Sequence, residues 1–114
     1  MEQASVIHAL RAFEKDVHEN ATSKGWHEDP SSLRDCVAMV VSELGEAIEW
    51  DRESDPGEPL CSNHIPFTGV EEELADVMIR VLDFARENNI DVVGAMMAKH
   101  EFNKTRPHKH GKRY

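Results

Sequence analysis

The sequence predicts an all-α fold of four helices arranged as a four-helix bundle. Apolar residues recur every three or four positions in four separate stretches of the 114-residue chain. The composition is rich in Glu, Ala, Leu and Val, only 6% of the residues are aromatic, and no stretch has a convincing strand pattern. The connections between the four stretches are short, which favours an up-and-down bundle.

The first two helices are expected at about 3–20 and 31–52. Helical spacing in the first comes from Val6, Leu10, Phe13 and Val17. Residues 24–30 break the pattern, and Ser31 or Ser32 can cap the second helix. One face of that helix carries six apolar residues: Leu33, Val37, Val40, Val41, Leu44 and Ile48.

The last two helices are expected at about 68–88 and 92–104. A Pro- and Gly-containing loop over 53–66 precedes them. Thr68 can cap the third helix, whose first turn is acidic, as the helix dipole favours. Asp91 can cap the fourth helix, and Pro107 stops it.

The chain fits one domain, which we assign to residues 1–107. Residues 108–114 are a basic, polar tail that we expect to be mobile. A domain this small would gain buried surface by pairing with another copy. No apolar run is long enough for a membrane span and the N-terminus lacks signal-peptide features, so we expect a cytoplasmic protein, no membrane partner and reduced thiols at Cys36 and Cys61.

Charge is unevenly distributed, within a net charge of −9. The first 98 residues carry seven basic and 21 acidic side chains, whereas six basic residues and one acid follow from Lys99 onward. The acidic body argues against binding of a nucleic acid polymer. The basic end is either a solubilising segment or part of a site for a polyanion.

Two pairs of acids indicate chemistry. Glu43 and Glu46 are three residues apart, as are Glu73 and Asp76, so each pair shares one helix face. Both pairs are bordered by apolar residues, where uncompensated carboxylates are costly. Four oxygen ligands suit Mg²⁺, and the absence of a Glu-x-x-His motif argues against iron or zinc at these helices. Either pair alone is more often a solvated helix face, but two pairs on adjacent helices favour a metal site.

These motifs resemble the MazG-like all-α nucleoside triphosphate pyrophosphatase superfamily, which includes dCTPase-like proteins. The resemblance lies in Glu43-Leu44-Gly45-Glu46, in Glu73-Leu74-Ala75-Asp76 after 26 intervening residues, and in the ending Lys99 to Pro107. It implies a MazG-type fold completed by dimerisation or tetramerisation, and Mg²⁺-dependent cleavage of a nucleoside triphosphate to monophosphate and pyrophosphate, with Mn²⁺ as a possible substitute.

The resemblance also implies roles for individual residues. The four acids match the metal ligands of the family, and Glu43 or Glu46 is the candidate catalytic base. Four residues near the end of the last helix match positions that meet phosphate or sugar: Lys99, Asn103, Lys104 and Arg106. Their other interpretation is a helix C-terminus that favours cations.

Further residues have weaker interpretations. Trp26 and Trp50 are candidates for stacking on the base, although a tryptophan at a helix end more often packs. His27, beside Trp26, is a weaker candidate. His108 and His110 have the spacing of a metal pair within a tail that is more often solvated, and isolated histidines such as His18 are given structural roles.

Three alternatives to this function remain open. The chain could be a non-enzymatic helical module that binds a partner, in which case neutralising the acids leaves function intact. It could be a different metal-dependent phosphohydrolase, which the reaction products would distinguish. A four-helix relative acting on a histidine-pathway intermediate is the third, with no specific residue in its favour.

Overall fold

A computed structural model describes the protein over residues 2–111. Four helices follow in order, α1 (Gln3–Ser23), α2 (Leu33–Glu53), α3 (Gly69–Glu87) and α4 (Val92–Lys104), with a short 3₁₀ helix over His108–Gly111. The predicted all-α class is confirmed. Within 2–111, β pairing is limited to two isolated bridges near the α2–α3 loop. In the same range no helix combines the length and the apolar character that crossing a membrane requires.

Side-chain caps define where three of the helices begin. The Ser32 hydroxyl accepts a hydrogen bond from the backbone N–H of Asp35, and the Asp35 carboxylate accepts one from the backbone N–H of Ser32. These two bonds form a capping box at the start of α2. Thr68 and Glu71 form the same motif at α3. Asp91 caps α4 through the Gly94 N–H. These starts agree with the capping residues predicted from the sequence.

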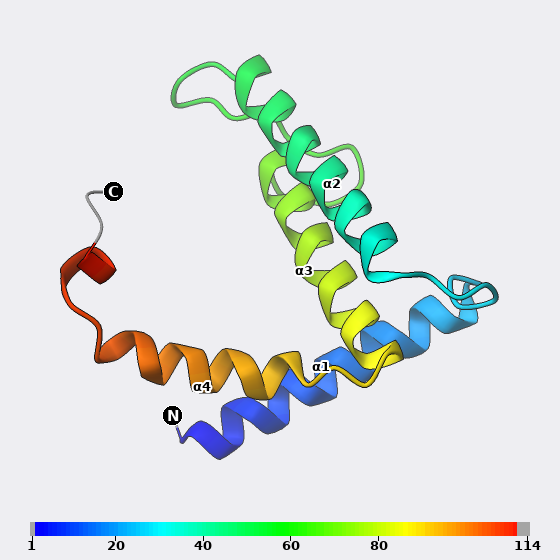
Figure 1. Ribbon diagram of the computed structural model, residues 1–114. Coiled ribbons are helices and arrows are strands. Elements are labelled where there is room, and N and C mark those ends of the chain that lie inside the picture. Colours follow the sequence, from blue (N-terminus) through cyan, green and yellow to red (C-terminus); the bar gives the residue numbers. More distant parts are fainter. Residues whose placement is uncertain (1, 112–114) are drawn as a thin grey trace.

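The four helices form an open arrangement rather than a closed bundle (Figure 1). α2 and α3 run antiparallel as a hairpin and make the most extensive contact, α3 also packs on α1, and α4 lies along α1. The radius of gyration is 16.6 Å, against about 13 Å for a compact chain of this length. An up-and-down order therefore holds for the hairpin, whereas α1 and α4 lie across its base.

Few apolar side chains are buried by this arrangement. Among the residues whose burial the structure describes, the buried hydrophobic ones are Ala47, Leu82, Ala85 and Val93. By contrast, an apolar stripe along α2 is exposed to solvent. Its members are Leu33, Val37, Val41, Leu44 and Ile48, each at least 41% exposed. The apolar face predicted for this helix therefore exists, but no other part of the described chain covers it.

The tail is described only in part. The short 3₁₀ helix occupies its start, and residues 112–114 lie outside the described range. The predicted mobility of 108–114 stays a prediction. Cys36 and Cys61 are free thiols, as expected.

Candidate metal centre

The antiparallel α2–α3 hairpin brings three of the four predicted acids together. Carboxylate oxygens of Glu43, Glu73 and Asp76 lie within 4.8 Å of one another. Glu43 is 8% exposed and Glu73 is 7% exposed, so the helix faces that carry them border the core, as the sequence indicated. Asp76 is partly buried. The fourth acid, Glu46, is exposed and lines a hollow together with Glu73, so it lies on the solvent side of the cluster.

Glu73 is the least satisfied member of the cluster. Its Oε2 atom is buried and has no hydrogen-bond partner among the described residues. Burial, together with the adjacent carboxyls of Glu43 and Glu46, raises the pKa of Glu73 to about 8. Burial and the charge of Glu43 also raise the pKa of Asp76. A divalent cation would satisfy the unpaired oxygen and offset this repulsion, so the residues fit the Mg²⁺ site that the resemblance implies.

Arg80 is a member of the site that the sequence analysis did not single out. Its Nε donates a 2.9 Å hydrogen bond to Glu43 Oε1, and its Nη2 lies 2.8 Å from the same oxygen. The guanidinium carbon also lies 5.5 Å from the centroid of the Trp26 ring, over its face. Arg80 follows Asp76 by four residues, and this spacing was the available signal that both lie on one face of α3.

Trp26 and Arg80 line a cavity of about 380 Å³ that reaches the acid cluster at Asp76. Its other walls include Phe13, Asn20 and Asp83, which the sequence analysis also missed as site residues. Trp26 is 58% exposed, so its ring is available to a planar ligand. The cavity combines an aromatic ring with amide and carboxylate groups, a mixed lining of the kind that holds and orients small-molecule ligands.

Trp50 packs on the helix backbone. A Cβ atom added to Gly69, in the first turn of α3, would overlap the Trp50 ring. The indole therefore depends on a glycine at this position. Trp50 also lines the hollow that contains Glu46 and Glu73, so it borders the acids from the opposite side to Trp26.

Within one chain, the four residues predicted to contact phosphate do not lie beside the acid cluster of α2 and α3. They belong to the end of α4 or follow it, and α4 extends along α1, away from the α2–α3 hairpin (Figure 1). The ammonium of Lys104 pairs with Glu101 at 2.9 Å, and Lys99 and Arg106 approach the ring of Phe102. Asn103 Oδ1 is buried and finds no hydrogen-bond partner in the described part of the chain. Their role in substrate binding stays a prediction.

Comparison with curated proteins finds nucleotide pyrophosphatases. The chain is 28% identical over 90 residues to dCTP pyrophosphatase 1 of Rattus norvegicus, covering 77% of this chain and 52% of that protein. The same enzyme of Homo sapiens is also 28% identical with equal coverage, and that of Bos taurus is 27% identical. The chain thus spans about half the length of these relatives. No family model and no solved structure matches. The similarity agrees with the MazG-like superfamily and supports no narrower assignment.

Proposed function

We propose that the protein is a Mg²⁺-dependent nucleotide pyrophosphohydrolase that cleaves a nucleoside or deoxynucleoside triphosphate to the monophosphate and pyrophosphate. The observation that carries the proposal is the cluster of Glu43, Glu73 and Asp76, in which one buried Glu73 oxygen has no hydrogen-bond partner within residues 2–111. The similarity to dCTP pyrophosphatases supports this reaction class. Mn²⁺ is the expected substitute metal.

The acids divide into two roles in this proposal. Glu43, Glu73 and Asp76 would hold the cation, with Glu46 facing it from the open side. When bound, Mg²⁺ neutralises phosphate charge and lowers the pKa of water. Glu46 is a better candidate for the catalytic base than Glu43, because Glu46 is exposed whereas Glu43 accepts a hydrogen bond from Arg80. Its carboxylate would take the proton from the water that attacks the α-phosphorus.

The cavity beside Asp76 is the proposed base site. Trp26 would stack on the nucleobase, and Asn20 and Asp83 offer hydrogen-bonding groups at its edge. Since the curated relatives act on dCTP, deoxycytidine and modified pyrimidine triphosphates are the first substrates to test. Trp50 would border the phosphates through its place beside Glu46.

A homodimer or homotetramer is the proposed working form. The exposed stripe on α2 and the small core leave apolar surface that a second copy would bury. The end of α4 is separated from the acids in one chain. An assembly is therefore the proposed way in which Lys99, Asn103, Lys104 and Arg106 approach the phosphates of a bound nucleotide.

The test is product analysis of the purified protein with Mg²⁺ and a panel of canonical and modified triphosphates. The expected result is equimolar monophosphate and pyrophosphate, abolished by EDTA and by Glu73→Gln. Asp51→Asn is the matched control, because it removes an exposed carboxylate from the same hairpin without touching the cluster. Circular dichroism confirms that each variant is folded.

Other outcomes would overturn the proposal. Release of orthophosphate would indicate a different metal-dependent phosphohydrolase. No turnover of any nucleotide with Mg²⁺ or Mn²⁺, together with a more stable Glu73→Gln variant, would favour the non-enzymatic partner-binding module.

A further inference from the structure

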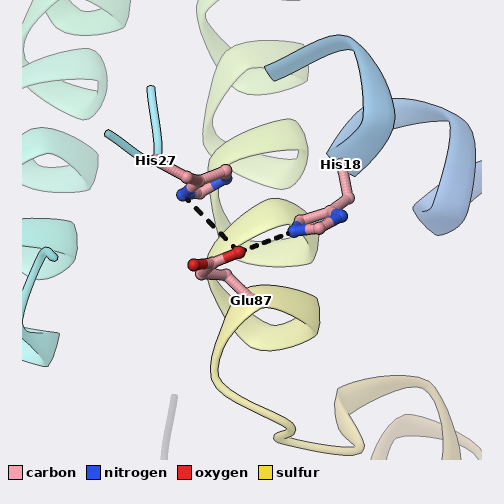
Figure 2. A group of neighbouring side chains, drawn as sticks. All are labelled: His18, His27 and Glu87. Atoms are coloured by element: carbon pink, nitrogen blue, oxygen red, sulfur yellow. Dashed lines mark hydrogen bonds and ion pairs between the residues drawn. The ribbon is translucent and has the colours of Figure 1, made fainter. Parts of the chain in front are cut away.

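A second cluster of ligating side chains lies at the other end of α3. His18 of α1, His27 of the α1–α2 loop and Glu87, the last residue of α3, converge there (Figure 2). His18 Nε2 lies 2.8 Å from Glu87 Oε1, and His27 Nδ1 lies 3.9 Å from the same oxygen. His18 is isolated in the sequence, but the fold brings it together with His27 and Glu87 from two other segments of the chain.

Asp83 orients the ring of His27. Asp83 Oδ1 accepts a 2.8 Å hydrogen bond from Nε2 of His27, whose side chain is 11% exposed. A proton held on Nε2 by this carboxylate leaves a lone pair on Nδ1, the nitrogen that faces Glu87. Histidines that ligate metals characteristically donate their second N–H to a carboxylate in this way.

The donor set differs in kind from the acid cluster. Two imidazoles and one carboxylate are the ligands of many zinc sites, in which a fourth tetrahedral position stays open. Zn²⁺ ligands stand about 2 Å from the metal, so their ligating atoms are about 3.3 Å apart. The observed separations of 2.8 and 3.9 Å bracket this value. The hydrogen bond from His18 also lowers the pKa of the Glu87 carboxyl.

The two clusters are separate sites. Glu87 lies 11 residues beyond Asp76 on the same helix, which corresponds to about 16 Å along the axis. Between them, Arg80 contacts Trp26 and Asp83 contacts His27, so the same face of α3 anchors two successive residues of the α1–α2 loop. An ion at the histidine cluster would fasten this loop, with Trp26, to the end of α3.

We propose that His18, His27 and Glu87 form a binding site for a divalent transition metal ion of the zinc type, with Asp83 as the residue that positions His27. The site shares no ligand with the acid cluster, although Asp83 also lines the cavity proposed for the base, and its test by metal binding does not depend on the proposed pyrophosphohydrolase activity. It joins α1, the α1–α2 loop and α3, so occupancy stabilises the fold of a chain that buries few apolar side chains.

The test is a titration of the full metal-free chain with Zn²⁺ against a chromophoric chelator, in a large excess of Mg²⁺. The excess of Mg²⁺ occupies carboxylate sites and competes weakly for imidazole. The expected result is one Zn²⁺ per chain, with binding lost in His27→Gln and weakened at least about tenfold in His18→Gln, Glu87→Gln and Asp83→Asn. Zn²⁺ should also raise the melting temperature of the wild type but not of His18→Gln.

Matched controls separate this site from other histidines. His8→Gln removes an exposed histidine of the same helix, and His108→Gln/His110→Gln removes the His-x-His pair of the tail. Both control proteins should bind Zn²⁺ as the wild type does. His18 and Glu87 are more exposed than His27, so their variants remain informative if His27→Gln does not fold. No Zn²⁺ binding by the wild type, binding unchanged in His18→Gln and Glu87→Gln, or loss of binding in the tail variant would each overturn the proposal.

Discussion

Arg80 neutralises Glu43 across the α2–α3 hairpin, with two guanidinium nitrogens within 2.9 Å of one carboxylate oxygen. This ion pair lies beside Glu73 and Asp76, whose pKa values are raised, so one cation compensates part of an otherwise repulsive cluster. Arg80 also stacks on Trp26. A single side chain thus links the candidate metal centre to the wall of the candidate base cavity.

We expect Arg80→Gln to destabilise the metal-free protein by about 1.5–3 kcal/mol, the range for a lost hydrogen bond to a charged group. The cost arises because Glu43 stays buried without its counter-charge. The measurement is urea unfolding in EDTA and in Mg²⁺, and the difference from wild type should shrink in Mg²⁺. Arg11→Gln is the control, since its pair with Asp91 is exposed and worth about 0–1 kcal/mol. Equal losses for the two variants would contradict this account of the pair.

The raised pKa of Glu73 predicts a pH-dependent stability with a definite sign. In the folded chain Glu73 titrates near pH 8, against an ordinary value of 4.5. Between these values the folded state holds a proton that the unfolded state has released, so this contribution to stability falls as pH rises from about 4.5 to 8. In EDTA, wild-type stability relative to Glu73→Gln should therefore decline over this window. A difference that is flat or rises with pH would show that Glu73 is ionised in the folded chain.

Two glycines near the acids should respond in opposite ways to alanine. Gly69→Ala places a methyl group in the Trp50 ring, and such overpacking costs about 1–3 kcal/mol. Gly45→Ala on α2 has nothing within 4 Å of the new methyl and should gain up to about 1 kcal/mol of helix propensity. Denaturant unfolding of both variants measures the contrast. A neutral Gly69→Ala would mean that Trp50 moves without cost.

Much of this architecture could be predicted from local sequence signals. The capping residues Ser32, Thr68 and Asp91 each bond to a residue three positions later. Such local interactions let the start of each helix be predicted from the sequence. The acid cluster was also readable, because i,i+3 spacing places each pair on one face. The histidine cluster could not be predicted from local spacing, because His18, His27 and Glu87 meet only through the packing of α1 on α3.

The element on which α4 packs could also not be predicted from the sequence. Its apolar positions indicate that one face is covered, but periodicity does not say by which neighbour. In the structure that neighbour is α1, and the basic end of α4 therefore lies apart from the acids. The predicted phosphate contacts depend on tertiary or quaternary arrangement rather than on local spacing.

Trp26 should contribute to nucleotide affinity through stacking. Loss of one base–aromatic stack costs about 1–3 kcal/mol, so Trp26→Ala should raise KM by about fivefold to 150-fold, whereas Trp26→Phe should retain most of the affinity. Steady-state kinetics with the best substrate of the panel gives both values. Phe67→Leu is the control, because Phe67 is an exposed aromatic residue that does not line this cavity. An unchanged KM in Trp26→Ala would place the base elsewhere.

The exposed apolar stripe on α2 should be an interface between copies of the chain. Val41 is 59% exposed and lies within the stripe, so Val41→Glu would bury a charge if a second copy covers it. Light scattering coupled to size-exclusion chromatography should then show a dimer or tetramer for the wild type and a monomer for Val41→Glu. Ala38→Glu adds the same charge at an exposed position of α2 outside the stripe and should leave the assembly intact. A monomeric wild type, or an assembly that tolerates Val41→Glu, would mean that the stripe is not the contact between copies.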